Sequence, residues 1–434
     1  MNSVKIYNRG LSAIKIKLQS KNWIYIQILY VIIFGFLTSQ LRLPSSISYI
    51  TDVLLLINLF YSCRKIRGSF HRTRGGFNFV ILILILAADI LGALLNFNSR
   101  TFLRLLWGLR NIGRTYLFFF CCVSLLDRKD ILNIIKIFDG ILFINLILCS
   151  YQYWIQGLWC DTVGGIFGTN YGCLSYVNLS LCISVAYHIS NYITRREKLT
   201  RCVIICCICF YLAAITELKI FFVEFILILV VLFLINRPSL KSLIIVVCGA
   251  GVLYVGLQIL GAILPDAAEV LTLEGIFENL TSEDGYTNSG DLSRLTAVTT
   301  LYDMFFDGNT LRSLFGFGLG NCETSGFSIF NTPFYSQYEY LHYRWMTHAM
   351  VYLETGAIGL ILFYLFLVAQ VLYAFLTRKA GDNLSGLAVV MGLIIIITTI
   401  YNSSFRTEAG YIIAFVLSIS YVLRKRMSRT SSAE

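Results

Sequence analysis

The chain has 434 residues, of which 57% are hydrophobic and only 14% are charged. A composition this apolar excludes a soluble globular protein, because too little polar surface would remain to cover the molecule. The formal net charge of +11 does not indicate a nucleic-acid partner, since the Lys and Arg residues form short clusters between apolar runs.

Apolar runs of membrane-spanning length follow one another along most of the chain. A helix needs about 20 apolar residues to cross the bilayer core. The runs lie at 23–40, 47–63, 77–96, 103–126, 132–156, 170–190, 202–217, 219–236, 241–263, 347–377, 383–402 and 408–423. Only Glu217 and Lys219 separate the seventh run from the eighth. We therefore predict an all-α, polytopic membrane protein with about 12 transmembrane helices.

The basic clusters predict how these helices are oriented. With the N-terminus inside, they fall on one side, in the N-terminal tail, 64–76, 127–131, 191–201, 237–241, 378–382 and the C-terminal tail. Positive charge is retained on the cytoplasmic side of a membrane. We therefore expect both termini to be cytoplasmic.

One long polar interval stands out between the apolar runs. Residues 264–346 contain eleven acidic and three basic residues, which is the balance of an external domain. The predicted organisation is a cytoplasmic segment (1–22), transmembrane helices 1–9 (23–263), a large extracytoplasmic loop (264–346), helices 10–12 (347–423) and a cytoplasmic tail (424–434).

Within the loop, apolar residues at helical spacing predict a helix over Leu292–Asn309. Asp291 or Ser293 would cap it and Gly308 would end it. Three alternating glycines follow, at Gly316, Gly318 and Gly320. They indicate either a turn whose backbone N–H groups bind an anion or a flexible loop.

Cysteine usage does not indicate a metal site. Most of the thirteen cysteines lie inside apolar runs, where a free Cys behaves as a small hydrophobic residue. No nearby His completes a zinc set, so we expect neither a metal nor another cofactor. Cys160 and Cys322 both fall in predicted external loops, and whether they form a disulfide stays open.

Several basic residues lie on the predicted external side or within spans, where charge is costly. They include Arg114, Lys219, Arg294 and Arg406. Each has a structural alternative, such as a snorkelling side chain or the local pair Glu217–Lys219. Taken together they predict a basic, outward-opening cavity for an anionic ligand, most plausibly a phosphate.

His348 is a candidate general base. An unperturbed imidazole titrates near pH 6.5, which suits proton transfer at neutral pH. His348 lies where the tenth span leaves the external loop, six residues before Glu354. The alternative is an ordinary interfacial residue.

The segment His348 to Leu353-Glu354-Thr355-Gly356 resembles the His…Glu-x-Gly signature of the bacterial O-antigen ligase and Wzy-type polysaccharide polymerase superfamily. Ser293-Arg294 with the later run Phe315-Gly316-Phe317-Gly318-Leu319-Gly320 resembles the family's loop helix and its Gly-rich turn. Gly164-Gly165-Ile166-Phe167-Gly168-Thr169-Asn170 is similar to its external Gly-x-Phe-Gly motif. Lys219 matches a position where these proteins carry a basic residue.

The resemblance implies a GT-C-like, metal-independent glycosyltransferase at the outer face of a bacterial plasma membrane. Its substrates would be undecaprenyl-diphosphate-linked glycans. Expected partners are the lipid bilayer, a flippase and a chain-length regulator. On this reading Arg294 and Lys219, with Arg406 or Arg114, hold the diphosphate. His348 is the base, with Glu354 as the second candidate, and loop aromatics such as Tyr286 and Tyr340 either stack on sugars or pack the loop.

The favoured function is a polymerase that joins repeat units into a surface polysaccharide. One alternative is a ligase of the same superfamily. Another is a lipid-linked oligosaccharide flippase or other transporter, although alternating access does not require a long external loop and transporters usually contain internal repeats.

Overall fold

The computed structural model describes residues 20–66, 76–97, 100–236, 285–287, 290–325, 327–379 and 381–425, with isolated positions between 244 and 258. Within these ranges every regular element is helical, apart from one antiparallel bridge between Tyr286 and Leu292. The prediction of an all-α protein is confirmed for this part of the chain.

A helix occupies each predicted span that lies in the described residues. They are α1 (Asn22–Ser39), α2 (Ile50–Ile66), α3 (Gly76–Leu95), α4 (Thr101–Leu125), α5 (Arg128–Ser150), α6 (Leu174–Ile193), α7 (Leu199–Ile215), α8 (Lys219–Ile235), α15 (Thr347–Thr377), α16 (Asn383–Tyr401) and α17 (Gly410–Lys425). The ninth predicted span, 241–263, lies largely outside the described residues. α7 and α8 are separate helices because the chain turns at Glu217, where φ is +52°.

Among the described residues, five helical segments are long and apolar enough to cross a membrane: Asn22–Ser39, Ser45–Lys65, Arg128–Ile155, Thr347–Thr377 and Asn383–Tyr401. Shorter apolar helices occur at Val80–Leu95, Leu199–Ile215 and Gly410–Arg424. The protein is therefore suited to a membrane by helix length and composition.

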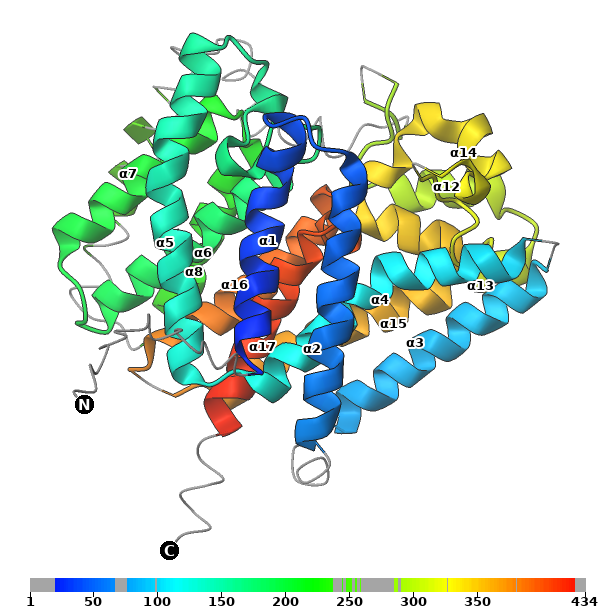
Figure 1. The fold of residues 1–434 in the computed structure, drawn as a ribbon, viewed down its shortest axis with the longest axis horizontal. Helices are drawn as coiled ribbons and strands as arrows, with labels where there is room; N and C mark the ends of the chain where they lie inside the picture. The colour runs from blue at the N-terminus through cyan, green and yellow to red at the C-terminus, as the bar shows by residue number, and fades with distance from the viewer. Residues whose placement is uncertain are drawn as a thin grey trace, which may run out of the picture.

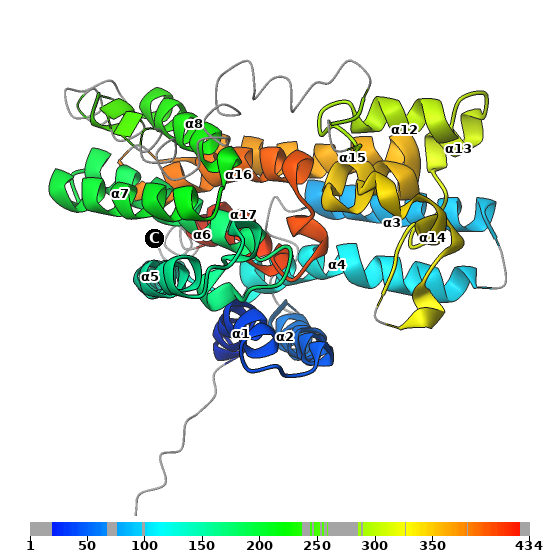
Figure 2. The same ribbon diagram turned by 90° about the horizontal axis from the view of Figure 1, so that it is seen from above.

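The helices form two groups around a central pair (Figures 1 and 2). α5–α8 make one group, while α2, α3, α4 and α15 lie on the other side with the loop helices. α16 and α17 lie between the groups, and α17 packs against α4, α15 and α16. The core therefore surrounds α17, most of whose side chains are fully buried.

Ion pairs connect the termini of several helices on one side of the bundle. Lys21 before α1 pairs with Asp130 at the start of α5, at 2.9 Å. Arg128 of α5 and Arg196 beyond α6 both pair with Asp382, just before α16. The segments that meet here are ones that the charge pattern assigns to the cytoplasmic side.

The described part of the polar interval 264–346 contains three further α-helices: α12 (Ala297–Phe305), α13 (Thr310–Phe315) and α14 (Pro333–Tyr338). The prediction of a helix over Leu292–Asn309 is wrong at its start. Thr296, rather than Asp291 or Ser293, occupies the position before the helix. The reason is that the backbone of Ser293 donates to the Gly285 carbonyl at 2.9 Å, which holds this segment in a non-helical bridge.

A second hydrophobic core joins the loop to the first two turns of α15. Leu292, Ala297 and Leu301 are buried against Ala349 and Leu353. Most loop aromatics also pack here, as in the cluster of Phe305, Phe334 and Tyr338. Tyr340 differs, because its side chain is 59% exposed.

Candidate functional site

The start of α15 is set apart from the rest of this helix by a break at Gly356. Gly356 has φ +64° and ψ −165°, a conformation that only glycine adopts readily. The backbone of Leu314 and Phe315 lies directly against it, where a Cβ atom would stand. The short segment 347–355 is therefore positioned by the loop.

The Gly-rich turn wraps around Glu354. Gly316, Gly318 and Gly320 all have positive φ, so their backbone N–H groups can converge. The Gly320 N–H donates to Glu354 Oε1 at 2.9 Å, and the Gly318 N–H donates to the Glu354 carbonyl at 2.9 Å. The turn thus binds an anion, and that anion is a carboxylate of the chain itself.

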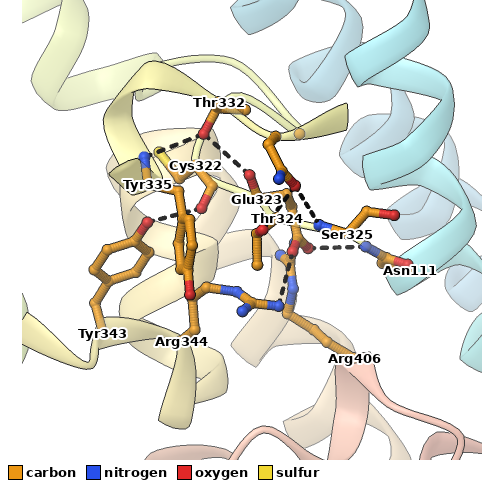
Figure 3. A network of polar contacts seen from close by, with 12 residues as sticks. Asn111, Cys322, Glu323, Thr324, Ser325, Thr332, Tyr335, Tyr343, Arg344 and Arg406 are labelled. Carbon is orange, nitrogen blue, oxygen red and sulfur yellow. Dashed lines mark hydrogen bonds and ion pairs between the residues drawn. The ribbon is translucent and has the colours of Figure 1, made fainter. Parts of the chain in front are cut away.

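The other Glu354 oxygen belongs to a buried cluster of charges. Arg406 Nη2 donates to Glu354 Oε2 at 2.7 Å and also pairs with Glu323. Figure 3 shows Glu323 between Arg406 and Asn111, whose Nδ2 donates to Glu323 at 3.0 Å. Arg344 adds a longer contact to Glu323, at 3.6 Å. We call Glu323, Glu354 and Arg406, with Asn111 and Arg344, the charge cluster.

Opposite charges favour the ionised forms of Arg406 and Glu323. Burial lowers the pKa of Arg406, but the carboxylates of Glu354 and Glu323 outweigh burial and raise it above its usual value. Burial raises the pKa of Glu323, but Arg406 and Arg344 outweigh burial and hold it below its usual value. Removing one partner from such a buried pair leaves an uncompensated charge, which costs about 3–5 kcal/mol.

A second set of ion pairs continues from the charge cluster to α4. Arg114 pairs with Glu408 at 2.7 Å and donates to the Arg406 carbonyl. Arg110 pairs with Asp52 of α2 at 2.9 Å. Arg114 and Arg406, both predicted to hold a diphosphate, are therefore brought together by the fold, but each is already neutralised by a carboxylate.

His348 is buried with unsatisfied ring nitrogens. The residue is 5% exposed, and neither Nδ1 nor Nε2 forms a hydrogen bond with any described residue. The backbone carbonyls of Arg294 and Thr399 lie beside the ring without a well-directed hydrogen bond. A buried imidazole without partners costs free energy unless a ligand supplies them.

Arg294 reaches the same place from the loop. Its Nε donates to the Tyr401 carbonyl at 3.1 Å, and its guanidinium lies 4.3 Å above the Tyr401 ring centre. No carboxylate among the described residues pairs with it. The structure thus brings Arg294 and His348 together at the end of α16, where no carboxylate of the described residues compensates the charge of Arg294.

Lys219 lies apart from this pair at the start of α8. Its ammonium group contacts Glu217 at 2.9 Å, and its side chain is 31% exposed. No hydrogen bond or ion pair between described residues joins it to His348 or Arg294. The geometry is that of the local ion pair considered as its structural alternative.

The sequence did not predict the carboxylates that pair with these arginines. Glu323 and Glu408 were not singled out, although Glu408 follows Arg406 by only two residues. Glu224 was also missed: it is fully buried in α8 and accepts hydrogen bonds from Asn178 and Cys182. A lone acidic residue inside an apolar run is the signal that would have found it.

Among the described residues, no three His, Cys, Asp or Glu side chains gather as a metal site. Cys160 and Cys322 are both buried free thiols.

No protein-family model matches the chain, and no curated protein matches it.

Proposed function

We propose that the chain is a polysaccharide polymerase that joins undecaprenyl-diphosphate-linked oligosaccharide units at the outer face of a bacterial plasma membrane. The observation that carries this proposal is that His348 and Arg294 meet near the end of α16, where the Arg294 backbone lies beside the His348 ring and its guanidinium stacks on Tyr401. Among the described residues, the ring nitrogens of His348 have no hydrogen-bond partner and the guanidinium of Arg294 has no carboxylate. An imidazole base and a guanidinium in one region suit attack by a hydroxyl on a glycosyl diphosphate.

In the proposed reaction, the acceptor hydroxyl oxygen forms a bond to the anomeric carbon of the donor sugar. The bond from that carbon to the phosphate oxygen breaks, and its electron pair leaves with the diphosphate. His348 takes the hydroxyl proton. Arg294 stabilises the departing diphosphate, which needs charge neutralisation rather than protonation.

The remaining predicted site residues take supporting roles in this proposal. Arg406 and Arg114 hold the external ends of the helices together. Their charges are neutralised in ion pairs with Glu354, Glu323 and Glu408. Glu354 fixes the direction of the first turns of α15, which carry His348. Lys219 contributes at most a longer-range positive charge.

The membrane arrangement belongs to the same proposal. Twelve spans in a GT-C-like architecture, with both termini in the cytoplasm, would place the loop and the start of α15 outside. The lipid-linked donor would arrive from a flippase, and a chain-length regulator would act on the growing product. Both are proposed partners.

The test is reconstitution of purified protein in liposomes with the host's lipid-diphosphate oligosaccharide. We expect a ladder of products that differ by one repeat unit, unchanged by EDTA. Arg294→Ala should abolish the ladder, while Arg294→Lys should keep part of it, because an ammonium replaces a bidentate fork. Transfer of preformed glycan without a ladder would instead indicate a ligase, and loss of activity with EDTA would overturn the metal-independent mechanism.

A further inference from the structure

The external loop contains a cavity of about 410 Å³ beside α12. Its walls are Gly285, Tyr286, Thr296, Thr299, Thr300, Asp303 and Met304, and we call it the threonine pocket. Figure 2 shows α12 along the outer edge of the loop helices. Small-molecule sites in proteins have volumes of about 300–1,000 Å³, so the threonine pocket is large enough for a ligand.

One face of α12 supplies most of the polar wall. Thr296, Thr299, Thr300 and Asp303 recur at the spacing that places side chains on one side of a helix. The opposite side, with Ala297 and Leu301, is buried in the core shared with α15. The hydroxyl-bearing face therefore lies on the side of α12 away from this core.

Thr296 has an unused hydrogen-bonding group in this wall. Its Oγ1 is buried and has no partner among the described residues. The hydroxyls of Thr299 and Thr300 donate to the Thr296 carbonyl, at 2.7 and 3.1 Å, so their oxygens can still accept hydrogen bonds. A ligand that carries hydroxyl groups would satisfy these atoms.

The charge of the wall restricts the ligand further. Among the described residues of the lining, Asp303 is the one carboxylate and none is Lys or Arg, so a phosphate would be repelled. Tyr286 offers an aromatic ring, and its hydroxyl contacts Met304 Sδ at 3.1 Å. An aromatic ring with a carboxylate and several hydroxyls suits an uncharged, hydroxyl-rich ring such as a sugar.

The threonine pocket lies next to Arg294 of the proposed reaction centre, both along the chain and through a backbone hydrogen bond. Gly285 on one wall accepts a hydrogen bond from the Ser293 backbone, directly before Arg294. Thr296 on the other wall follows Arg294 by two residues. We propose that the threonine pocket binds an uncharged sugar residue of the oligosaccharide whose diphosphate lies at Arg294. The identity of this oligosaccharide rests on the proposed function.

Binding of free oligosaccharide to the full-length protein in nanodiscs tests this site. The probe is the oligosaccharide released by mild acid from the host's lipid-linked pool, freed of lipid and phosphate, and the dissociation constant is measured by calorimetry. Thr296→Val removes a hydroxyl without breaking a hydrogen bond within the described chain, so folding should survive. We expect about 3- to 10-fold weaker binding for Thr296→Val and about tenfold weaker binding for Tyr286→Ala.

Thr310→Val is the matched control, because Thr310 is an exposed threonine at the start of α13. It should bind the probe like the wild type, and all three variants should keep the wild-type melting temperature within a few degrees. Equal binding by Thr296→Val, Tyr286→Ala and wild type would overturn the site, as would no binding by the wild type. His348→Ala should bind the probe normally, so loss of polymer formation with intact probe binding separates the two proposals.

Discussion

The charge cluster and the region of His348 lie close together in the fold. They differ in how many of their charged and polar groups have partners within the protein. In the charge cluster, Glu354 and Glu323 are matched by Arg406, by Asn111 and by backbone N–H groups. At the end of α16, His348 has no hydrogen-bond partner and Arg294 has no carboxylate among the described residues. In the charge cluster the charges are neutralised by the protein, although Arg406 Nη1 is buried without a hydrogen-bond partner among the described residues. At His348 and Arg294 neither the ring nitrogens nor the guanidinium charge is matched within the described residues.

This difference separates residues that hold the fold from residues available to a substrate. A neutralised guanidinium gains little from a diphosphate unless it first gives up its carboxylate. A guanidinium that stacks on an aromatic ring and donates to one carbonyl can add a phosphate without such a loss. Sequence alone placed Arg406, Arg114 and Arg294 in one group, and the structure divides them.

The largest expected effect is on turnover, at His348. His348→Ala should lower polymer formation by about 10² to 10⁴, because positioned proton transfer is worth that factor. Binding of the lipid-diphosphate donor should be retained, which steady-state assays and donor titration would measure together. His342→Ala is the control, since His342 pairs with Asp291 at the loop surface. Full activity of His348→Ala would remove it from the role of base.

Arg406→Met should reduce stability by about 3–5 kcal/mol, because it leaves Glu323 and Glu354 buried without their cation. The free energy of unfolding in detergent would show this as a large drop. Arg344→Met also removes a positive charge from Glu323, but its contact is longer and its side chain is more exposed. That variant should lose less than about 1 kcal/mol. Similar losses for both would contradict a structural role specific to Arg406.

Gly356→Ala should cost about 1–3 kcal/mol, since its backbone conformation is nearly restricted to glycine and Leu314 occupies the space of a Cβ atom. Gly113→Ala in α4 is the control. It lies within a helix with open space around it and should be neutral or slightly stabilising. Thermal unfolding of the two variants would compare them, and an undisturbed Gly356→Ala would exclude the break as a fixed feature.

The helices could be predicted from the sequence because a bilayer imposes a length that apolar runs report directly. The alternating glycines indicate either a turn or a flexible loop, and the structure has the turn, with positive φ at all three glycines. That this turn binds Glu354 could not be predicted, because Glu354 lies 34 residues away from Gly320 along the chain. The pairing of Arg114 with Glu408, separated by 294 residues, depends likewise on how α4 and α17 meet.

Stability should fall in acid because of the buried loop carboxylate Glu323. Burial raises the pKa of Glu323, but the guanidinium groups of Arg406 and Arg344 outweigh burial and hold this pKa below the usual 4.5. A carboxyl with a depressed folded-state pKa stabilises the fold above the unfolded pKa, and this is lost as pH falls through the folded value. Melting temperatures should therefore decline below about pH 4.5. The decline should be shallower in Glu323→Gln, and an identical decline would contradict the assignment.

The smallest expected effect is at Lys219. Lys219→Ala should change stability by less than about 1 kcal/mol, because its pair with Glu217 is partly exposed. Polymer formation should stay near the wild-type rate, in contrast to Arg294→Ala, in the same liposome assay. A loss as severe as that of Arg294→Ala would place Lys219 on the diphosphate after all.

The break at Gly356 also sets how much of α15 is available to span a bilayer. The full helix has 31 residues, which at 1.5 Å per residue is roughly 46 Å and exceeds the hydrocarbon thickness of about 30 Å. The part after the break, 357–377, is roughly 31 Å long and matches that thickness. The turns that carry His348 would then stand above the hydrocarbon, at the level of lipid headgroups. A diphosphate joined to a membrane-embedded polyprenyl chain would meet His348 there without leaving the lipid.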